Sequence, residues 1–230
     1  RPAVSTIIIA VLSLVALGSL KRTWRYSRPD GAAQLATLLG VPLIGVEAGI
    51  LLGVGLSLLL FLWRTSQPHM AVVGQVPGTE HFRNIERFAV VESPEVLSLR
   101  VDESLYFPNS RYLEERIAEL IAARPQVRHL VLMCPGVNLI DASALDSLEN
   151  ITERLHTAGV QLHLSEVKGP VMDQLKRSSF LQEFGGQVFI SQFQALQTLS
   201  PRVALHTLRQ GALDMAVQSQ MESPPTENRP

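Results

Sequence analysis

Two long apolar runs open the chain, and an ordinary mixture of polar and apolar residues follows them. The first run, Ala3–Leu20, holds no charged residue, and the second, Gly31–Trp63, holds only Glu47. A helix needs roughly 20 apolar residues to cross about 30 Å of hydrocarbon. The pattern therefore predicts transmembrane helices in residues 1–63, followed by a water-soluble part that begins at Arg64.

The second run is too long for one upright crossing and too short for two full crossings. Pro42 and Gly45 lie near its midpoint, and proline breaks a helix because it removes a backbone donor. We therefore predict two short, closely packed segments, Ala32–Val41 and Gly45–Leu62. Short segments interrupted by glycine or proline recur in transporters that are built from inverted repeats.

Four polar or small residues of this run are candidate functional residues. Gly45, Gly49 and Gly53 are spaced four apart on one helical stripe, where small residues let another helix approach closely. Glu47 is the one intramembrane charge, and a carboxylate at that depth costs on the order of 3 kcal/mol. Glu47 could be functional, could lie near an interface, or could pair with a basic group elsewhere in a longer protein.

The charges that flank the apolar runs predict an orientation. Positive loops stay in the cytoplasm. If the second run enters the membrane and returns, Arg64 and all that follows are cytoplasmic too. Trp24, Tyr26 and Trp63 lie where interfacial aromatic residues are expected. The basic residues between the runs are Lys21, Arg22, Arg25 and Arg28.

After a polar linker at residues 64–86, the pattern predicts one α/β domain over residues 87–200 and a partly disordered tail over residues 201–230. The order is βαβαβα, which is typical of a mostly parallel or mixed sheet with helices packed on it. The predicted strands are residues 87–92, 96–101, 129–134, 160–165 and 187–190. The predicted helices begin at Asn109 or Ser110, Ala142, Lys168 and Ser191, and end near Ala123, Thr157, Ser178 and Leu199.

The net charge of −1 hides an asymmetry between the two parts. Residues 1–63 carry five basic and two acidic residues, and residues 64–230 carry fifteen basic and nineteen acidic residues. A soluble part with a net charge of −4 does not favour binding to nucleic acid, whose phosphates are negatively charged. The single cysteine, Cys134, excludes an internal disulfide and fits a reducing compartment. Because the chain opens in an apolar run without an initial methionine, we expect it to be the C-terminal part of a longer membrane protein.

The residues predict no enzyme, metal or cofactor. The six histidines are scattered without metal-ligand spacing, and no glycine-rich phosphate loop occurs between a strand and a helix. One turn is a candidate site. Asp141 is at the expected N-cap of the helix from Ala142, and Ser143 is in its first turn. A helix N-terminus accommodates an anion or a phosphoserine, although Asp141 could simply cap the helix and Ser143 could be an ordinary polar residue.

Four stretches resemble the C-terminal end of a SulP-type anion permease with its STAS domain. Gly45–Gly49, with the leucine-rich sequence after it, is similar to the final membrane segment of that family. Leu105–Ile117, Val137–Leu145 and Val167–Val171 are similar to a strand-to-helix step, the central turn and the opening of the third helix of the STAS domain. The resemblance implies a multi-pass secondary transporter of an anion such as sulfate or bicarbonate, whose anion site lies on membrane helices outside this chain.

The resemblance also implies partners and a site. It implies that the protein lies in the inner cell membrane, contacts membrane lipid and forms a homodimer. It also implies a cytoplasmic STAS domain that serves regulation, assembly or binding of a regulatory protein. Relatives that antagonise anti-sigma factors carry Asp-Ser-Ser-Gly at the central turn, with the second serine phosphorylated. Asp141 and Ser143 match that pattern, and Ala142 and Ala144 depart from it. The alternative is a membrane-tethered STAS regulatory protein that transports nothing.

Overall fold

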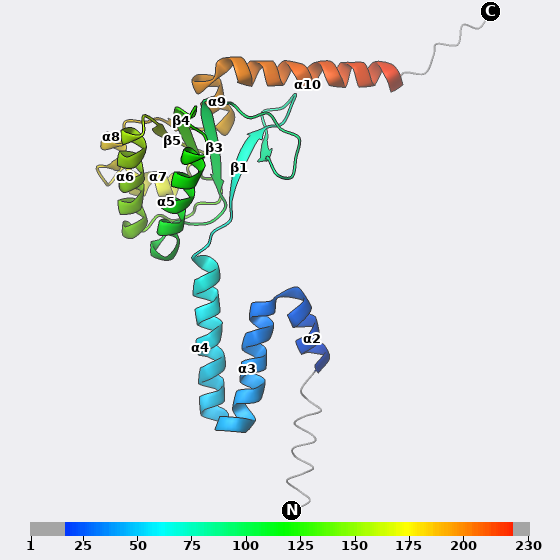
Figure 1. The fold of residues 1–230 in the computed structure, drawn as a ribbon, viewed down its shortest axis with the longest axis vertical. Helices are drawn as coiled ribbons and strands as arrows, with labels where there is room; N and C mark the ends of the chain where they lie inside the picture. Colours follow the sequence, from blue (N-terminus) through cyan, green and yellow to red (C-terminus); the bar gives the residue numbers. More distant parts are fainter. Residues whose placement is uncertain (1–16, 223–230) are drawn as a thin grey trace, which may run out of the picture. The chain divides into compact units, whose positions relative to one another are not determined.

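The computed structural model describes residues 17–222 and divides the chain between Thr65 and Ser66 into two compact units. The described part of the first unit is helical, and the described part of the second is an α/β domain (Figure 1). Among the described residues, one helix, Val46–Thr65, is long and apolar enough to cross a membrane. The predicted span Ala3–Leu20 lies outside the described residues, except for its last four positions.

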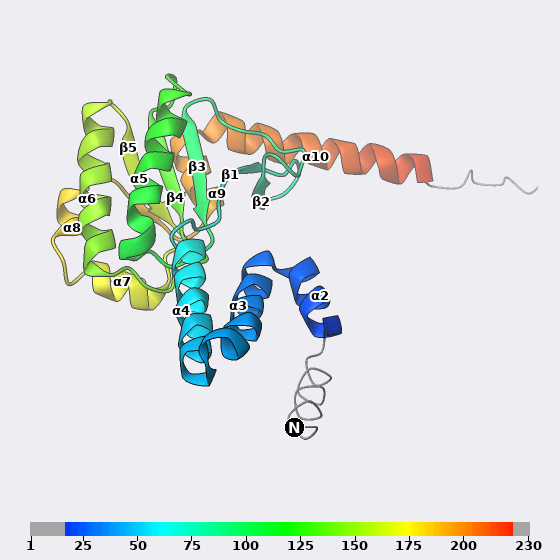
Figure 2. The same cartoon turned by 60° about the horizontal axis from the view of Figure 1, so that its bottom comes forward.

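The described part of the first unit contains α2 (Leu17–Tyr26), α3 (Arg28–Ile44) and α4 (Val46–Thr65). The Ser27 hydroxyl begins α3 by accepting the N–H of Asp30 at 3.4 Å. The chain then reverses at Gly45, so that α3 and α4 form an antiparallel hairpin (Figures 1 and 2). Gly45 has a φ of 102°, which glycine adopts without a steric penalty. The break therefore lies at Gly45, while Pro42 remains inside α3, which extends beyond the predicted Ala32–Val41.

Two of the three glycines of the predicted stripe lie where α4 meets α3. A methyl group on Gly49 would collide with the backbone of Val41, and one on Gly53 would collide with Thr37. Gly45 has open space beside it and forms the turn instead. The spacing therefore permits a close helix contact at two positions and a reversal of the chain at the third.

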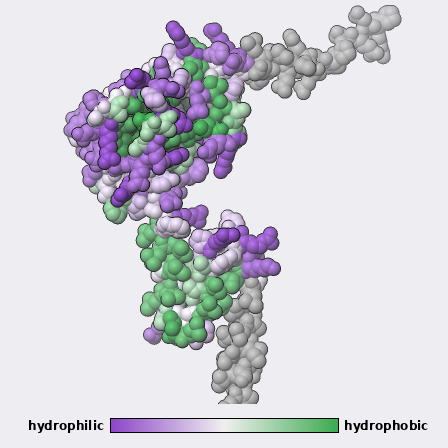
Figure 3. Space-filling view, viewed as in Figure 1, coloured by the Kyte–Doolittle hydropathy of each residue, from purple (hydrophilic) through white to green (hydrophobic). Residues whose placement is uncertain are grey.

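The outward surface of the hairpin is mostly apolar (Figure 3). A helix that is apolar on all sides is either buried in protein or embedded in lipid. The exposed apolar side chains include Leu43, Ile44, Val46, Leu51, Leu59, Phe61 and Trp63.

A six-stranded mixed sheet in the order β2-β1-β3-β4-β5-β6 forms the centre of the second unit. The strands are β1 (Met70–Gln75), β2 (Phe82–Asn84), β3 (Val96–Val101), β4 (His129–Met133), β5 (Gln161–Ser165) and β6 (Val188–Phe189). Strands β3 to β6 are parallel, and β1 is antiparallel to both of its neighbours. The predicted α/β fold with a mixed sheet is confirmed for this unit.

Helices cover both faces of the sheet and enclose two apolar cores. The helices are α5 (Phe107–Ala122), α6 (Ala142–Thr157), α7 (Gly169–Leu175), α8 (Phe180–Glu183), α9 (Gln192–Leu199) and α10 (Pro201–Glu222). Helices α5 to α8 pack on one face, where α5 and α6 lie side by side (Figure 2), and α9 packs on the other. The larger core therefore lies beneath α5 and α6.

Two segments predicted outside the domain belong to its fold. The predicted linker, residues 64–86, contains β1 and β2, and Val73 and Phe82 within it are buried. The predicted tail begins with α10, where Ala204 and Thr207 are fully buried, whereas residues 223–230 lie outside the described part. These apolar runs are short and are flanked by proline and glycine, so their burial depends on contacts made by the rest of the domain.

The predicted strand at residues 87–92 is wrong. Asn84 instead starts a turn, because its carbonyl accepts the N–H groups of Arg87 and Phe88. Only Val91 joins the sheet, through an isolated bridge to Gln75. The alternating apolar and polar residues of this stretch therefore belong to an ordered loop and not to a strand.

Candidate functional site

The turn between β4 and α6 lies at the carboxyl ends of the parallel strands, and a second loop holds it in place. The N–H of Asn138 donates to the Ser104 hydroxyl at 3.2 Å. The N–H of Leu105 donates to the carbonyl of Leu139 at 2.9 Å, and the N–H of Asp141 donates to the carbonyl of Leu105 at 3.1 Å. The two loops thus form a short parallel pairing, which fixes the position where α6 begins.

Asp141 holds the first turns of two helices. Its Oδ1 accepts the N–H of Ala144 at 2.8 Å, which places it at the N-cap of α6. Its Oδ2 accepts the N–H of Phe107, the first residue of α5, at 2.9 Å. Each helix start has backbone donors without an intrahelical partner, and the carboxylate satisfies one of them in both helices.

Ser143 is half-exposed in the first turn of α6. Among the described residues, its hydroxyl has no hydrogen-bond partner. The hydroxyl is therefore reachable from solvent, and within residues 17–222 it makes no hydrogen bond that would hold the fold together. Asp141 is two positions away, but its two carboxylate oxygens are already engaged with backbone N–H groups.

A cation and two apolar side chains lie around this turn, and the sequence interpretation did not single them out. The Nζ of Lys168 donates to Oδ1 of Asn138 at 2.7 Å. The side chains of Phe107 and Leu139 are 72% and 45% exposed. We call Phe107, Asn138, Leu139, Ser143 and Lys168 the turn surface. Exposed apolar groups beside polar ones are a usual composition for a protein-binding patch.

We expect Asp141→Ala to lower the free energy of unfolding by about 1–2 kcal/mol, because backbone N–H groups of two helices lose their acceptor. Ser143→Ala should change it by less than about 0.5 kcal/mol. Urea denaturation of residues 66–222 measures both changes. Asp146→Ala, an exposed aspartate of the same helix, is the matched control. Equal effects of Asp141→Ala and Asp146→Ala would contradict the capping role.

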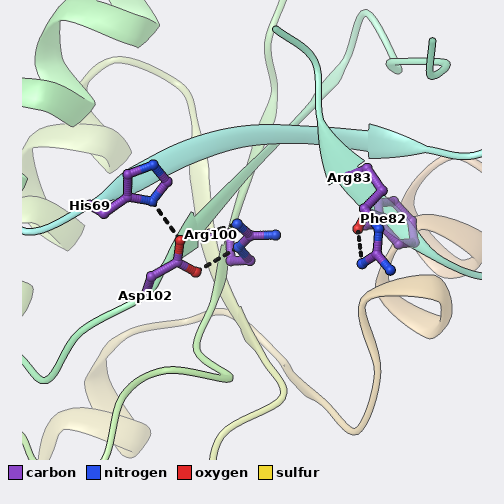
Figure 4. Close-up of polar contacts among 5 residues, drawn as sticks. All are labelled: His69, Phe82, Arg83, Arg100 and Asp102. Carbon is purple, nitrogen blue, oxygen red and sulfur yellow. Dashed lines mark hydrogen bonds and ion pairs between the residues drawn. The ribbon is translucent and has the colours of Figure 1, made fainter. Parts of the chain in front are cut away.

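A second polar cluster fixes the point where the chain enters β1 (Figure 4). Arg100 donates from Nε to Oδ1 of Asp102 at 2.6 Å and from its Nη2 to Oδ2 at 3.1 Å. Nδ1 of His69 lies 2.6 Å from the same Oδ2. Arg83 on β2, also drawn in Figure 4, donates instead to the carbonyl of Phe82.

The charge of Asp102 is stabilised by this cluster. Burial alone would raise the pKa of Asp102, but hydrogen bonds from Arg100 and His69, together with their charges, outweigh burial and lower it. The N–H of Asp102 also donates to the carbonyl of His69 at 3.1 Å. These contacts tie the start of β1 to the end of β3, which is a structural task.

The remaining reactive groups of the described residues include one thiol and the scattered acidic and histidine side chains. Burial raises the pKa of the Cys134 thiol to about 12, so it stays protonated and unreactive near neutral pH. Within residues 17–222, no group of three or more His, Cys, Asp and Glu side chains could hold a metal ion.

A groove of about 590 Å³ between α6 and α8 lies apart from the turn surface. Phe180 and Phe184 line it together with three glutamates. Carboxylates disfavour an anionic ligand, so this groove does not suit an anion. The glutamates are Glu149, Glu153 and Glu183.

Glu47 is exposed in the first turn of α4, directly after the reversal at Gly45. The N-terminus of a helix carries a partial positive charge that stabilises a carboxylate. Glu47 is therefore placed at the tip of the hairpin, away from the midpoints of α3 and α4.

Residues 87–198 match the family described as the STAS domain. The chain is 32% identical over 212 residues to High affinity sulfate transporter 2 of Stylosanthes hamata, with 87% of this chain and 32% of the relative covered. It is also 32% identical over 209 residues to Sulfate transporter 1.3 of Arabidopsis thaliana, with 86% of this chain and 32% of the relative covered. Both matches therefore include sequence on either side of the boundary between the two units.

Two solved structures share the fold. The overall structure of SLC26A9 covers 91% of this chain with a TM-score of 0.72 and 18% identity, and this chain covers 34% of it. The inward-facing murine Solute Carrier 26 family member A9 anion transporter covers 81% of this chain with a TM-score of 0.74 and 20% identity, and 31% of that chain is covered. The chain spans about a third of the length of the curated relatives that it matches. Residues 87–198 are thus a STAS domain, and the chain that contains it is similar to sulfate transporters of the SulP type over most of its length.

Proposed function

We propose that this chain is the C-terminal part of a secondary anion transporter, and that its STAS domain serves regulation, assembly or partner binding. The observation that carries the proposal is the match to sulfate transporters of two plants, which extends over 86–87% of the chain. The proteins named in these matches are transporters rather than enzymes, which supports a function without catalysis. Sulfate or a related anion is the proposed substrate, and its site lies on membrane helices outside this chain.

In this proposal, α3 and α4 form the final membrane hairpin. Helix α4 has 20 residues, about 30 Å at 1.5 Å per residue, which matches the hydrocarbon thickness. The antiparallel pairing puts Arg28 and Arg64 at the same end of the hairpin. The apolar exterior of the hairpin supports contact with lipid. Glu47 then lies near the opposite interface, which lowers the cost of its charge.

The orientation follows from the basic residues at the two open ends of the hairpin. We place these ends, and with them the STAS domain, in the cytoplasm, and the hairpin in the inner cell membrane. The domain boundaries we propose are residues 1–65 for the membrane part and residues 66–222 for the folded soluble part, which revises the linker and tail.

The turn surface is the proposed contact for a cytoplasmic regulatory protein or for a second copy of the transporter. Its exposed apolar side chains supply contact area, and the accessible Ser143 hydroxyl offers a place where phosphorylation would add charge. Because this hydroxyl makes no hydrogen bond among the described residues, we expect its modification to change binding without unfolding the domain. The alternative function, a tethered STAS regulator without transport, uses the same surface.

Uptake of radiolabelled anions into vesicles tests the proposal. Vesicles would carry the full-length protein, the protein without residues 66–230, or Ser143→Ala, each normalised to protein amount. We expect the truncation to lower uptake or abundance severalfold while the order of anion preference stays the same. Ser143→Ala should leave the basal preference and the fold unchanged.

Two outcomes would contradict it. A changed order of preference in the truncated protein would place part of the selectivity in the STAS domain. No uptake of any anion by the intact protein, with partner binding retained, would favour the tethered regulator.

A further inference from the structure

Helix α2 presents an unusual concentration of positive charge. Its ten residues include Lys21, Arg22 and Arg25 and no acidic residue, and Arg28 begins the next helix. All four side chains are exposed, and among the described residues none of them forms an ion pair. Lys21 and Arg25 are four apart on the helix, where like charges repel. A bound anion would remove this repulsion.

The position of α2 is fixed by the start of α3. The Trp24 side chain and backbone press against Gly31, so that a methyl group there would collide with the indole ring. Ser27 separates the two helices and caps the second one. The basic side chains are therefore held beside the open end of the α3–α4 hairpin by packing.

The surface of α2 also has the shape and the aromatic residues of an interfacial site. Lys21, Arg22, Arg25 and Tyr26 line an open hollow of about 450 Å³. Tyr26 is 93% exposed and Trp24 is 43% exposed. Aromatic rings and long cationic side chains gather at membrane surfaces, where the rings lie at the level of the headgroups.

We propose that α2 lies in the membrane–water interface and binds the phosphate groups of anionic phospholipids through Lys21, Arg22 and Arg25. This inference rests on the membrane location proposed above. Charge complementarity favours anionic over zwitterionic lipid, and each basic residue at the surface strengthens the attraction. A free sulfate or phosphate ion shares the same oxyanion chemistry, so the test separates lipid from free anion.

The test compares lipids retained by the purified full-length protein after release from nanodiscs made of equal parts phosphatidylglycerol and phosphatidylcholine. Native mass spectrometry counts the bound lipids. We expect the protein to retain phosphatidylglycerol preferentially. A triple variant with Lys21→Gln, Arg22→Gln and Arg25→Gln should reduce that preference at least tenfold. The control variant removes one lysine and two arginines from the exposed surface of the STAS domain and should keep the preference. Its changes are Lys176→Gln, Arg177→Gln and Arg202→Gln.

Two further measurements, displacement by free anions and washing with carbonate, separate the possible explanations. Millimolar inorganic sulfate or phosphate should not displace the retained lipid, and displacement by either ion would make α2 a site for free anion and overturn the lipid assignment. Equal retention of both lipids by a protein that stays in the membrane after carbonate washing would overturn this inference alone. Release of the protein by carbonate would overturn the proposed membrane location itself.

Discussion

Residues 66–222, expressed without the helical unit, are expected to unfold in one cooperative transition, whereas residues 80–198 are expected to form no stable fold. The two fragments differ by β1 and α10. Strand β1 lies inside the sheet, between β2 and β3, so its removal leaves one edge of β3 without a hydrogen-bonded neighbour and detaches β2.

The expected effect is large because β1 contributes to both cores. Val72 belongs to the core beneath α5 and α6, and Ala71 and Val73 belong to the core beneath α9. Burial of each of the two valine side chains contributes roughly 1.5–3 kcal/mol, and Ala71 contributes less. The summed loss therefore approaches the lower end of the stability of an ordinary domain, about 5–15 kcal/mol.

Circular dichroism during urea denaturation and binding of a hydrophobic dye measure the difference. The shorter fragment should bind the dye and show no sharp transition. A third fragment, residues 66–198, keeps β1 but lacks α10, and it separates the contribution of the strand from that of the helix. A cooperative transition in residues 80–198 would show that β1 is dispensable and that the linker prediction was adequate.

The parallel part of the sheet could be predicted from sequence because its signals are local. The run at residues 129–134 is continuously apolar, and the helix over residues 142–157 has a regular apolar stripe; both elements are present in the structure. The β1 run is equally apolar but short, and Pro68 and Pro77 lie close to it. Its place in the sheet depends on pairing with β3, which is more than twenty residues further along the chain.

The candidate site was predicted only in part, for the same reason. The N-cap role of Asp141 is a local pattern, because its acceptor serves a donor three residues later. Its second contact, to Phe107, joins residues 34 positions apart. The contact between Lys168 and Asn138 spans 30 positions. Such contacts arise because parallel strands bring their carboxyl ends to one edge of the sheet, an arrangement that periodicity does not reveal.

A pair formed by the buried His163 and the half-buried His129 is expected to give the domain a dependence on pH that no sequence motif indicates. His163 on β5 is 1% exposed, and its Nε2 lies 3.1 Å from Nδ1 of His129 on β4. Nδ1 of His163 accepts the N–H of Gln187 at 3.1 Å. Because Nδ1 accepts, Nε2 carries the proton of the neutral ring and donates it to His129. Protonation at Nδ1 would break the bond to Gln187.

Burial, followed by the charge of His129, lowers the pKa of His163 to about 4 from 6.5. Burial also lowers the pKa of His129, against an opposing effect of Glu95. The unfolded chain therefore binds more protons than the folded domain between these two values. The contribution of His163 is present above pH 6.5 and is lost as the pH falls towards 4.

We expect residues 66–222 to lose stability on acidification from pH 7.5 to pH 4.5, and His163→Gln to reduce that loss by roughly 2–3 kcal/mol. Glutamine keeps a donor towards His129 and an acceptor for the N–H of Gln187, but it does not titrate. Urea denaturation at both pH values measures the difference. His156→Gln removes an exposed histidine of α6 and should leave the loss unchanged. Because Asp102 also loses its ion pair in acid, only the difference between variants is assigned to His163. An equal loss in all three proteins would mean that His163 titrates with the same pKa in the folded and the unfolded chain, which would contradict a neutral His163 within the fold.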